Sequence, residues 1–421
     1  MNQLRAMQDE ASEKGRLQVN VVSSVTAFPV TNALISISYT GIPENTLETL
    51  TTDSSGQTET VELDAPPEEW SLDRNNERQP YSEYTLDISA PGYEPVSISG
   101  AEILANTKAI QNVRMRPSDN GQDEEEVFVI PAHTLYGDYP PKIAEEEIKP
   151  TNETGEIVLS RVVIPEYIVV HDGSPRDSTA KNYYVKYKDY IKNVASSEIY
   201  ATWPANTIRA NVLAIMSFTL NRVYTEWYRN KGYDFTITSS TAFDHKWIPE
   251  RNVYESISVI VDELFSNYLS RPNVRQPILT QYCDGRRVSC PDWMTQWGSK
   301  ELGDKGLSPI EILRYYYGDD MYINTAQEIS GIPASWPGYN LEQGARGDKV
   351  RQMQEEINVI AGAYPAIPKI SVDGIYGPAT AAAVEKIQSV FGLPVTGITD
   401  YKTWYKISEI YVGVSRIAEL T

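Results

Sequence analysis

The first part of the chain alternates apolar and polar side chains with a period of two. Such alternation is typical of strands that bury one face. Turn-forming stretches rich in Asp, Ser, Gly and Pro separate the runs. We therefore predict a small β-sandwich over residues 1–116. The alternating runs are residues 17–21, 33–39, 58–63 and 84–89.

The hydrophobic period changes to that of helices in the middle of the chain. Two short apolar runs between these helices favour strands instead. This mixture predicts an α+β domain over residues 161–330. The expected helices span residues 187–200, 208–229 and 253–269, and the expected strands span residues 235–238 and 278–282.

Three further helical segments follow a Pro/Gly-rich break and predict a separate unit over residues 335–421. Gly347 and Asp348 supply a turn and an N-cap. Pro378 stands in the first turn of the second segment, where its missing N–H costs nothing. Apolar positions on the first two segments can pack into a three-helix core. The segments are residues 348–361, 378–391 and 400–412, and the positions are Val350, Met353, Ile357, Val384, Ile387 and Phe391.

Residues 117–160 are acidic and are interrupted by Pro and Gly. Such a composition cannot bury enough apolar surface to order itself. We therefore predict an acidic linker, and an accessible linker is where a protease cuts. The fold class is multidomain: an N-terminal β-sandwich, a central α+β domain and a C-terminal three-helix domain.

Length, charge and hydropathy narrow the range of functions. The 421 residues have room for two to four domains. The net charge of −20 argues against a nucleic-acid partner, because phosphate binding needs clustered Lys and Arg. We expect no membrane partner, since no run of about 18 apolar residues is present. The first ten residues lack the apolar core of a secretory signal, so the usual export route is not expected.

The C-terminal unit resembles the common peptidoglycan-binding domain of wall hydrolases nearly from end to end. The resemblance rests on residues 341–354, 373–380 and 397–404. It implies that this unit holds peptidoglycan. In that family the groove lies near the loop that begins at Asp373, so Asp373, Tyr376 and Thr380 are the candidate glycan contacts.

Two segments of the middle domain resemble the SpoIID/LytB family of sporulation-linked lytic transglycosylases. Residues 195–204 place Glu198 where the family has its catalytic glutamate, and residues 295–317 match a second family block. Two departures stand out: Met216 replaces a usual Arg, and the histidine before the second block is absent. The resemblance implies that Glu198 is catalytic. The candidate substrate contacts near the two segments are Tyr200, Trp203, Gln296 and Trp297.

A single glutamate is sufficient for this chemistry. Ordinary glycosidases use two carboxyl groups, but a lytic transglycosylase captures the reacting sugar carbon with the sugar's own C6 hydroxyl. One group can then donate a proton and take one back. Burial beside apolar or aromatic side chains raises the pKa of a carboxyl group and keeps it protonated. The alternative for Glu198 is an exposed residue at a helix end.

Cys283 and Cys290 are separated by a short loop. Relatives of SpoIID can bind zinc through Cys and His, and His245 is the nearest candidate for a third ligand. A disulfide or a pair of reduced thiols explains the two cysteines equally well. Zinc is therefore one of three open interpretations.

The order of the parts resembles the clostridial spore cortex-lytic enzymes of the SleC type, and the N-terminal pattern resembles transthyretin-like domains. This resemblance implies a precursor activated by a subtilisin-like protease of the Csp type, with cortex peptidoglycan as its substrate. It also implies a place at the boundary of spore cortex and coat, reached from the mother cell without a signal peptide. The alternative is a non-catalytic peptidoglycan-binding spore structural protein on a degenerate SpoIID scaffold.

Overall fold

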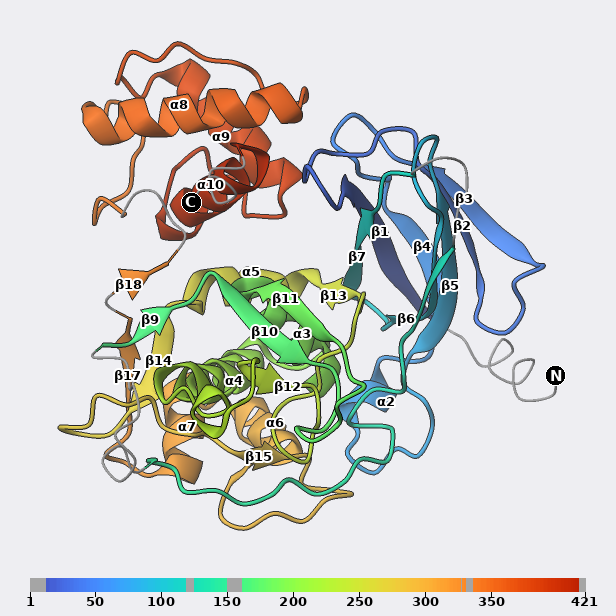
Figure 1. The fold of residues 1–421 in the computed structure, drawn as a ribbon, viewed down its shortest axis with the longest axis vertical. Helices are drawn as coiled ribbons and strands as arrows, with labels where there is room; N and C mark the ends of the chain where they lie inside the picture. The colour runs from blue at the N-terminus through green and yellow to red at the C-terminus, as the bar shows by residue number, and fades with distance from the viewer. Residues whose placement is uncertain (1–12, 119–124, 150–160, 327, 331–335, 416–421) are drawn as a thin grey trace.

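The computed structural model describes residues 13–118, 125–149, 161–326, 328–330 and 336–415. Three parts follow one another along the chain: a strand-rich part, a mixed part and a helical part (Figure 1). The multidomain α+β organisation expected from the hydrophobic pattern is therefore confirmed. Within the described residues, the helices are all too short or too polar to cross a membrane.

The N-terminal part consists of two facing sheets (Figure 1). The alternation of apolar and polar side chains explains why these strands form two facing sheets. The inward positions, such as Leu17, Val19 and Val21, are fully buried between them. One sheet has the order β13-β7-β1-β4 and the other β3-β2-β5-β6-β8. The bounds are β1 (Glu13–Ser23), β2 (Leu34–Tyr39), β3 (Thr46–Thr51), β4 (Val61–Ala65), β5 (Ser82–Ser89), β6 (Val96–Ile103), β7 (Lys108–Met115) and β8 (Glu126–Val129), with a short α2 (Glu69–Leu72).

The first of these sheets takes a strand from the middle part of the chain. Strand β13 (Val253–Tyr254) pairs antiparallel with β7, so the two parts share a sheet. A buried ion pair lies beside this strand, where Arg251 donates to Glu102 at 2.6 Å. The expected helix over residues 253–269 is therefore wrong in its bounds. Helix α5 covers only Glu255–Leu264, because the residues on either side of it form strands. Strand β13 pairs with β7, and β14 (Asn267–Ser270) pairs with a later strand of the middle part.

The middle part is arranged around helix α4 (Ala205–Tyr224), whose side chains are buried on nearly every face. The helix therefore lies inside the domain, with α3, α5, α6 and α7 packed around it, and its buried polar side chains, such as Asn211 and Arg222, are hydrogen-bonded. The other elements are β9 (Val163–Ile164), β10 (Tyr167–His171), β11 (Asn182–Lys186), α3 (Tyr187–Glu198), η1 (Arg229–Lys231), β12 (Ile237–Thr238), β15 (Tyr282–Cys283), β16 (Met294–Thr295), α6 (Gln296–Asp304), α7 (Pro309–Tyr317), β17 (Tyr322–Thr325) and β18 (Glu328–Ile329).

The C-terminal part contains the three expected helices, α8 (Asp348–Ala363), α9 (Pro378–Val390) and α10 (Tyr401–Ser415). Gly347 has a φ of 126°, which favours glycine, and Pro378 opens α9 as expected. Five of the six expected core positions are buried and Phe391 packs against them. Helix α10 also packs against α5, so the helical part is docked on the middle part.

The acidic segment is not a free linker over its described residues. We call residues 133–149 the strap, because they cross the middle part in an extended course, drawn in teal in Figure 1. Just before the strap, β8 joins the N-terminal sheet. Over residues 125–149 the segment is therefore attached: β8 pairs with β6 of the N-terminal sheet, and the strap finds partners on the middle part. Residues 119–124 and 150–160 of the predicted processing region lie outside the described residues.

Candidate functional site

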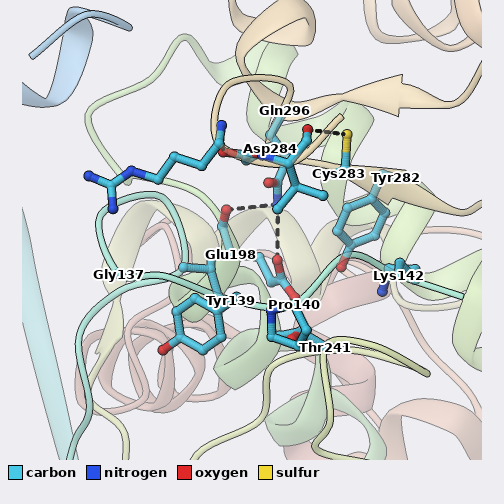
Figure 2. A pocket seen from close by; sticks show the side chains of 13 residues that line it. Gly137, Tyr139, Pro140, Lys142, Glu198, Thr241, Tyr282, Cys283, Asp284 and Gln296 are labelled. Carbon is cyan, nitrogen blue, oxygen red and sulfur yellow. Dashed lines mark hydrogen bonds between the residues drawn. The ribbon is translucent and has the colours of Figure 1, made fainter. Parts of the chain in front are cut away.

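Glu198, the last residue of α3, lines a pocket of about 470 Å³ between the middle part and the strap (Figure 2). Its side chain is buried, with only 5% exposure. The pocket brings together residues from four distant stretches of the sequence. They are Thr134, Gly137, Tyr139, Pro140, Lys142, Glu198, Thr241, Tyr282, Cys283, Asp284, Arg287, Val288 and Gln296.

Two donors fix the carboxyl group of Glu198. The amide of Gln296, the first residue of α6, donates to the Glu198 Oε2 at 3.0 Å and to its main-chain oxygen at 2.9 Å. The backbone N–H of Lys246 donates to the Glu198 Oε1 at 2.9 Å. The structure thus brings together in one pocket Glu198 and Gln296, which the sequence analysis named as a catalytic candidate and a substrate-contact candidate.

Tyr282 and Lys142 complete the polar surroundings of the carboxyl group, and the sequence reasoning missed both. Burial, and then the neighbouring Glu198, raise the pKa of Tyr282 well above its ordinary value. Its hydroxyl faces Glu198 but finds no well-formed hydrogen bond among the described residues. The Nζ of Lys142 lies 5.0 Å from the centre of the Tyr282 ring and donates to the main-chain oxygen of Asp244. Burial lowers the pKa of Lys142, while Glu198 opposes that shift.

The strap supplies one wall of the pocket through Tyr139, Pro140 and Lys142. Beyond the pocket it runs along residues 276–281, which hold it by hydrogen bonds of 2.7–3.2 Å between backbone groups and glutamine side chains. No sequence signal marks this contact, because it joins stretches about 130 residues apart. The pairs are Leu279 with Glu147, Gln281 with Ile143 and Glu145, and Gln276 with Lys149.

Two arginines hold the carboxylates of the strap. Arg222, which is fully buried, donates to both oxygens of Glu145 at 2.6 and 3.0 Å and to Asp244 at 2.8 Å. Arg271 donates to both oxygens of Glu147 at 2.7 and 2.8 Å. Such two-point pairs between a guanidinium and a carboxylate are strong and directional. They fix the strap on the middle part.

Three of the expected sugar contacts do not line the pocket. Tyr200, Trp203 and Trp297 form a buried cluster, in which the Trp203 and Trp297 ring centres are 5.0 Å apart. The indole N–H of Trp203 donates to the main-chain oxygen of Ser71 in α2, and Tyr200 packs on His133. The N-terminal part and the strap therefore cover these aromatic rings. Their burial argues against direct sugar contact.

The expected metal ligands are not arranged as a zinc site. Cys283 and Cys290 form a disulfide, with their Cα atoms 6.1 Å apart, so neither offers a thiolate. His245 is fully buried between the rings of Phe218 and Tyr282. Within the described ranges, no group of three or more His, Cys, Asp or Glu is placed to hold a metal ion. The disulfide, one of the three interpretations left open, is the one that the structure contains.

The candidate glycan contacts of the C-terminal part differ in exposure. Tyr376 and Thr380 are 1% and 3% exposed. The Tyr376 hydroxyl donates to the main-chain oxygen of Gly397, and the Thr380 hydroxyl accepts from Gln354. These two side chains hold the loops of their own domain, and their burial argues against direct glycan contact. Asp373 is exposed and remains a candidate.

Comparison with known proteins identifies the C-terminal part. Residues 346–407 match the family described as "Putative peptidoglycan binding domain". The chain is also 40% identical over 77 residues to a zinc D-Ala-D-Ala carboxypeptidase of Streptomyces albus G, and 41% identical over 83 residues to an uncharacterised protein of Kitasatospora aureofaciens. These matches cover 18% and 20% of this chain. They span 28% and 64% of the length of the two relatives.

Among solved structures, the 5-hydroxyisourate hydrolase of Klebsiella pneumoniae matches 25% of this chain and 92% of its own. Its sequence identity is 17% and its TM-score is 0.17, which is too low to support an argument about fold or function. The family match alone carries the conclusion. This chain contains a C-terminal peptidoglycan-binding domain.

Proposed function

We propose that this chain is the precursor of a peptidoglycan lytic transglycosylase that degrades spore cortex during germination. One observation carries the proposal: the carboxyl group of Glu198 lies buried in a pocket, fixed by Gln296 and by the Lys246 N–H. The resemblance to SpoIID/LytB proteins over residues 195–204 and 295–317 supports the same residue. The peptidoglycan-binding domain supplies the attachment to the substrate.

The proposed reaction uses Glu198 twice. Its protonated carboxyl group donates to the oxygen of the glycosidic bond, and the bond between that oxygen and the sugar C1 breaks. The C6 hydroxyl of the same sugar then attacks C1 and returns its proton to the Glu198 carboxylate. The products are a free 4-hydroxyl end and a 1,6-anhydro end, so neither water nor a second carboxyl group is consumed.

A second candidate function is a non-catalytic peptidoglycan-binding spore protein. The strap favours it, because Tyr139, Pro140 and Lys142 form one wall of the pocket and narrow the space around Glu198. The two candidates differ in whether removal of the strap produces an enzyme.

Digestion of purified cortex separates these candidates. We expect the processed wild-type protein to release muropeptides with 1,6-anhydro ends, and we expect Glu198→Gln to lower the rate by at least about 1,000-fold, because no proton donor remains. Binding of both proteins to cortex should be equal, since the C-terminal domain is unchanged. Equal release by the two proteins, or release of reducing ends, would contradict the transglycosylase.

Activation by proteolysis is the second expectation. We infer that a subtilisin-like protease of the Csp type cuts between residues 117 and 165, and that the uncut protein waits at the cortex and coat boundary. The contacts of the strap and of α2 support this, because the strap forms one wall of the pocket and α2 holds the Trp203 side chain. We expect turnover of cortex to rise at least about tenfold after cutting, as the substrate gains access to a covered site. Equal rates of cortex turnover by the cut and the uncut protein would contradict the proposal that this chain is a precursor.

Zinc has support only from the name of the Streptomyces relative. Because the disulfide leaves no thiolate at Cys283 or Cys290, the proposed reaction is written without a metal. The proposal therefore assigns the proton transfers to Glu198 alone.

A further inference from the structure

A second cavity, of about 410 Å³, lies under the far end of the strap. Arg271 and Glu147 line it together with the aromatic side chains of Trp293 and Tyr316, and the carboxyl groups of Glu145 and Asp292 also lie in its wall. Trp293 and Tyr316 are only partly buried, so part of each ring is open to the solvent. Rings of this kind stack on sugars, while an arginine fork binds carboxylates at two points.

The strap already places a carboxylate on this arginine. Both oxygens of Glu147 accept hydrogen bonds from Arg271, from Nε at 2.7 Å and from Nη2 at 2.8 Å. The third nitrogen, Nη1, pairs with Asp320, which is 64% exposed. If Glu147 leaves, Nε and Nη2 of Arg271 lose their acceptor, while the pair with Asp320 keeps the side chain in place.

The chain is strongly acidic, so an arginine in the wall of a cavity indicates which chemical group the cavity can bind. The chain has a net charge of −20, and three acidic side chains line this cavity, so Arg271 is the group in its lining that can receive a carboxylate. The strap binds Arg271 with a two-point carboxylate pair and lies along residues 276–281 with its backbone extended. An acidic peptide in extended form thus occupies this surface, within the same chain.

We propose that Arg271, with Trp293 and Tyr316, forms a subsite for the carboxylates of peptidoglycan stem peptides, and that Glu147 occupies this subsite in the uncut chain. The proposal rests on the proposed function for its substrate class. Stem peptides join amino acids that bear free carboxylates to the glycan, so one ligand offers both the anionic group and the sugar ring. Arg222 is not part of the subsite, since it is fully buried and also paired with Asp244.

The test uses the full chain and the variant Glu147→Ala. Glu147 is about one-third exposed, so its truncation leaves the fold intact, which thermal unfolding checks. The probe is a soluble disaccharide tripeptide from peptidoglycan, and a second probe has all its carboxylates amidated. We expect Glu147→Ala to bind the first probe about tenfold more tightly than the wild type in calorimetry, because the internal competitor is gone. We expect no gain with the amidated probe.

Two further variants locate the gain. Adding Arg271→Gln to Glu147→Ala should abolish the tenfold gain, while adding Arg275→Gln, at an exposed arginine four residues away, should preserve it. Binding by the C-terminal domain is common to all variants and cancels in the comparison. An absent gain, an equal gain with both probes, or a gain that survives Arg271→Gln would overturn the subsite.

The result of this binding test does not depend on whether the chain is a transglycosylase. A chain that gains affinity through Arg271 but releases no anhydro ends from cortex would keep the subsite and lose the proposed reaction. A chain that releases anhydro ends without this gain would keep the reaction and lose the subsite.

Discussion

At the scale of single residues, Gln296 decides how well Glu198 is held. Its amide donates to both the carboxylate and the main-chain oxygen of Glu198, in a place where both residues are at most 5% exposed. We expect Gln296→Leu, which keeps the volume but removes the donors, to lower kcat about 10- to 100-fold. KM should change little, since Gln296 is expected to position Glu198 rather than to bind the sugar.

Steady-state kinetics of the processed protein on soluble glycan strands would check this expectation. The matched control is Thr241→Val, another lining residue of the same pocket whose side chain is not expected to position Glu198. A variant at position 296 with raised KM and unchanged kcat would place Gln296 in sugar binding instead.

At the scale of elements, the strap depends on the ionisation of Glu145. Burial opposes that ionisation, but the hydrogen bonds and charge of Arg222, and then Lys149, outweigh it and lower the pKa of Glu145 to about 2. A carboxyl group with a lowered pKa stabilises the folded form above its ordinary value, here 4.5, and loses this effect as the pH falls through its folded value. The strap should therefore loosen as the pH falls from 4.5 towards 2.

Hydrogen exchange of residues 143–149 as a function of pH would measure this loosening. We expect the protection of these amides to fall in the acid range for the wild type. In Glu145→Gln protection should already be low at neutral pH and should vary much less with acid. Protection that stays constant down to pH 2 in the wild type would show that the ion pair does not hold the strap.

At the scale of the whole molecule, a buried charge cluster docks the C-terminal domain. Asp262 on α5 lies within 2.8–3.7 Å of the ammonium groups of Lys188, Lys192 and Lys406, the last of which belongs to α10. Burial opposes ionisation of Asp262, but the three lysines together lower its pKa. We expect Asp262→Asn to destabilise the docked form by about 3 kcal/mol, since Lys192 loses its buried carboxylate while Glu409 still pairs with Lys188 and Lys406.

Small-angle scattering and thermal unfolding would detect the separation of the C-terminal domain in Asp262→Asn. The neighbouring Glu263→Gln is the matched control. Glu263 also pairs with α10, through Lys402 at 3.2 Å, but its side chain is 26% exposed. We expect an effect of at most about 1 kcal/mol from this solvated pair. Equal scattering curves for wild type and Asp262→Asn would show that Asp262 is not needed to hold the two parts together.

The fold could be predicted from sequence wherever local pattern and tertiary contacts agree. The three C-terminal helices follow from their apolar spacing and from Gly347 and Pro378, because a short three-helix core is made by near neighbours in the chain. The stretch at residues 253–269 is different. Its apolar residues fit a helix, but strand pairing with β7 and β17 converts both ends into strands. The hydrophobic period of one segment cannot reveal a partner strand that lies elsewhere in the sequence.

The sequence alone determined the residue types and spacings: a glutamate at a helix end, a glutamine block, and a C-terminal unit that matches peptidoglycan-binding domains. Only the tertiary structure decided what surrounds them. The strap is acidic and broken by Pro and Gly, so its composition favoured a free linker, yet its carboxylates pair with Arg222 and Arg271. Such pairing depends on where the fold places two buried or half-buried cations, and a linear pattern carries no information about that distance.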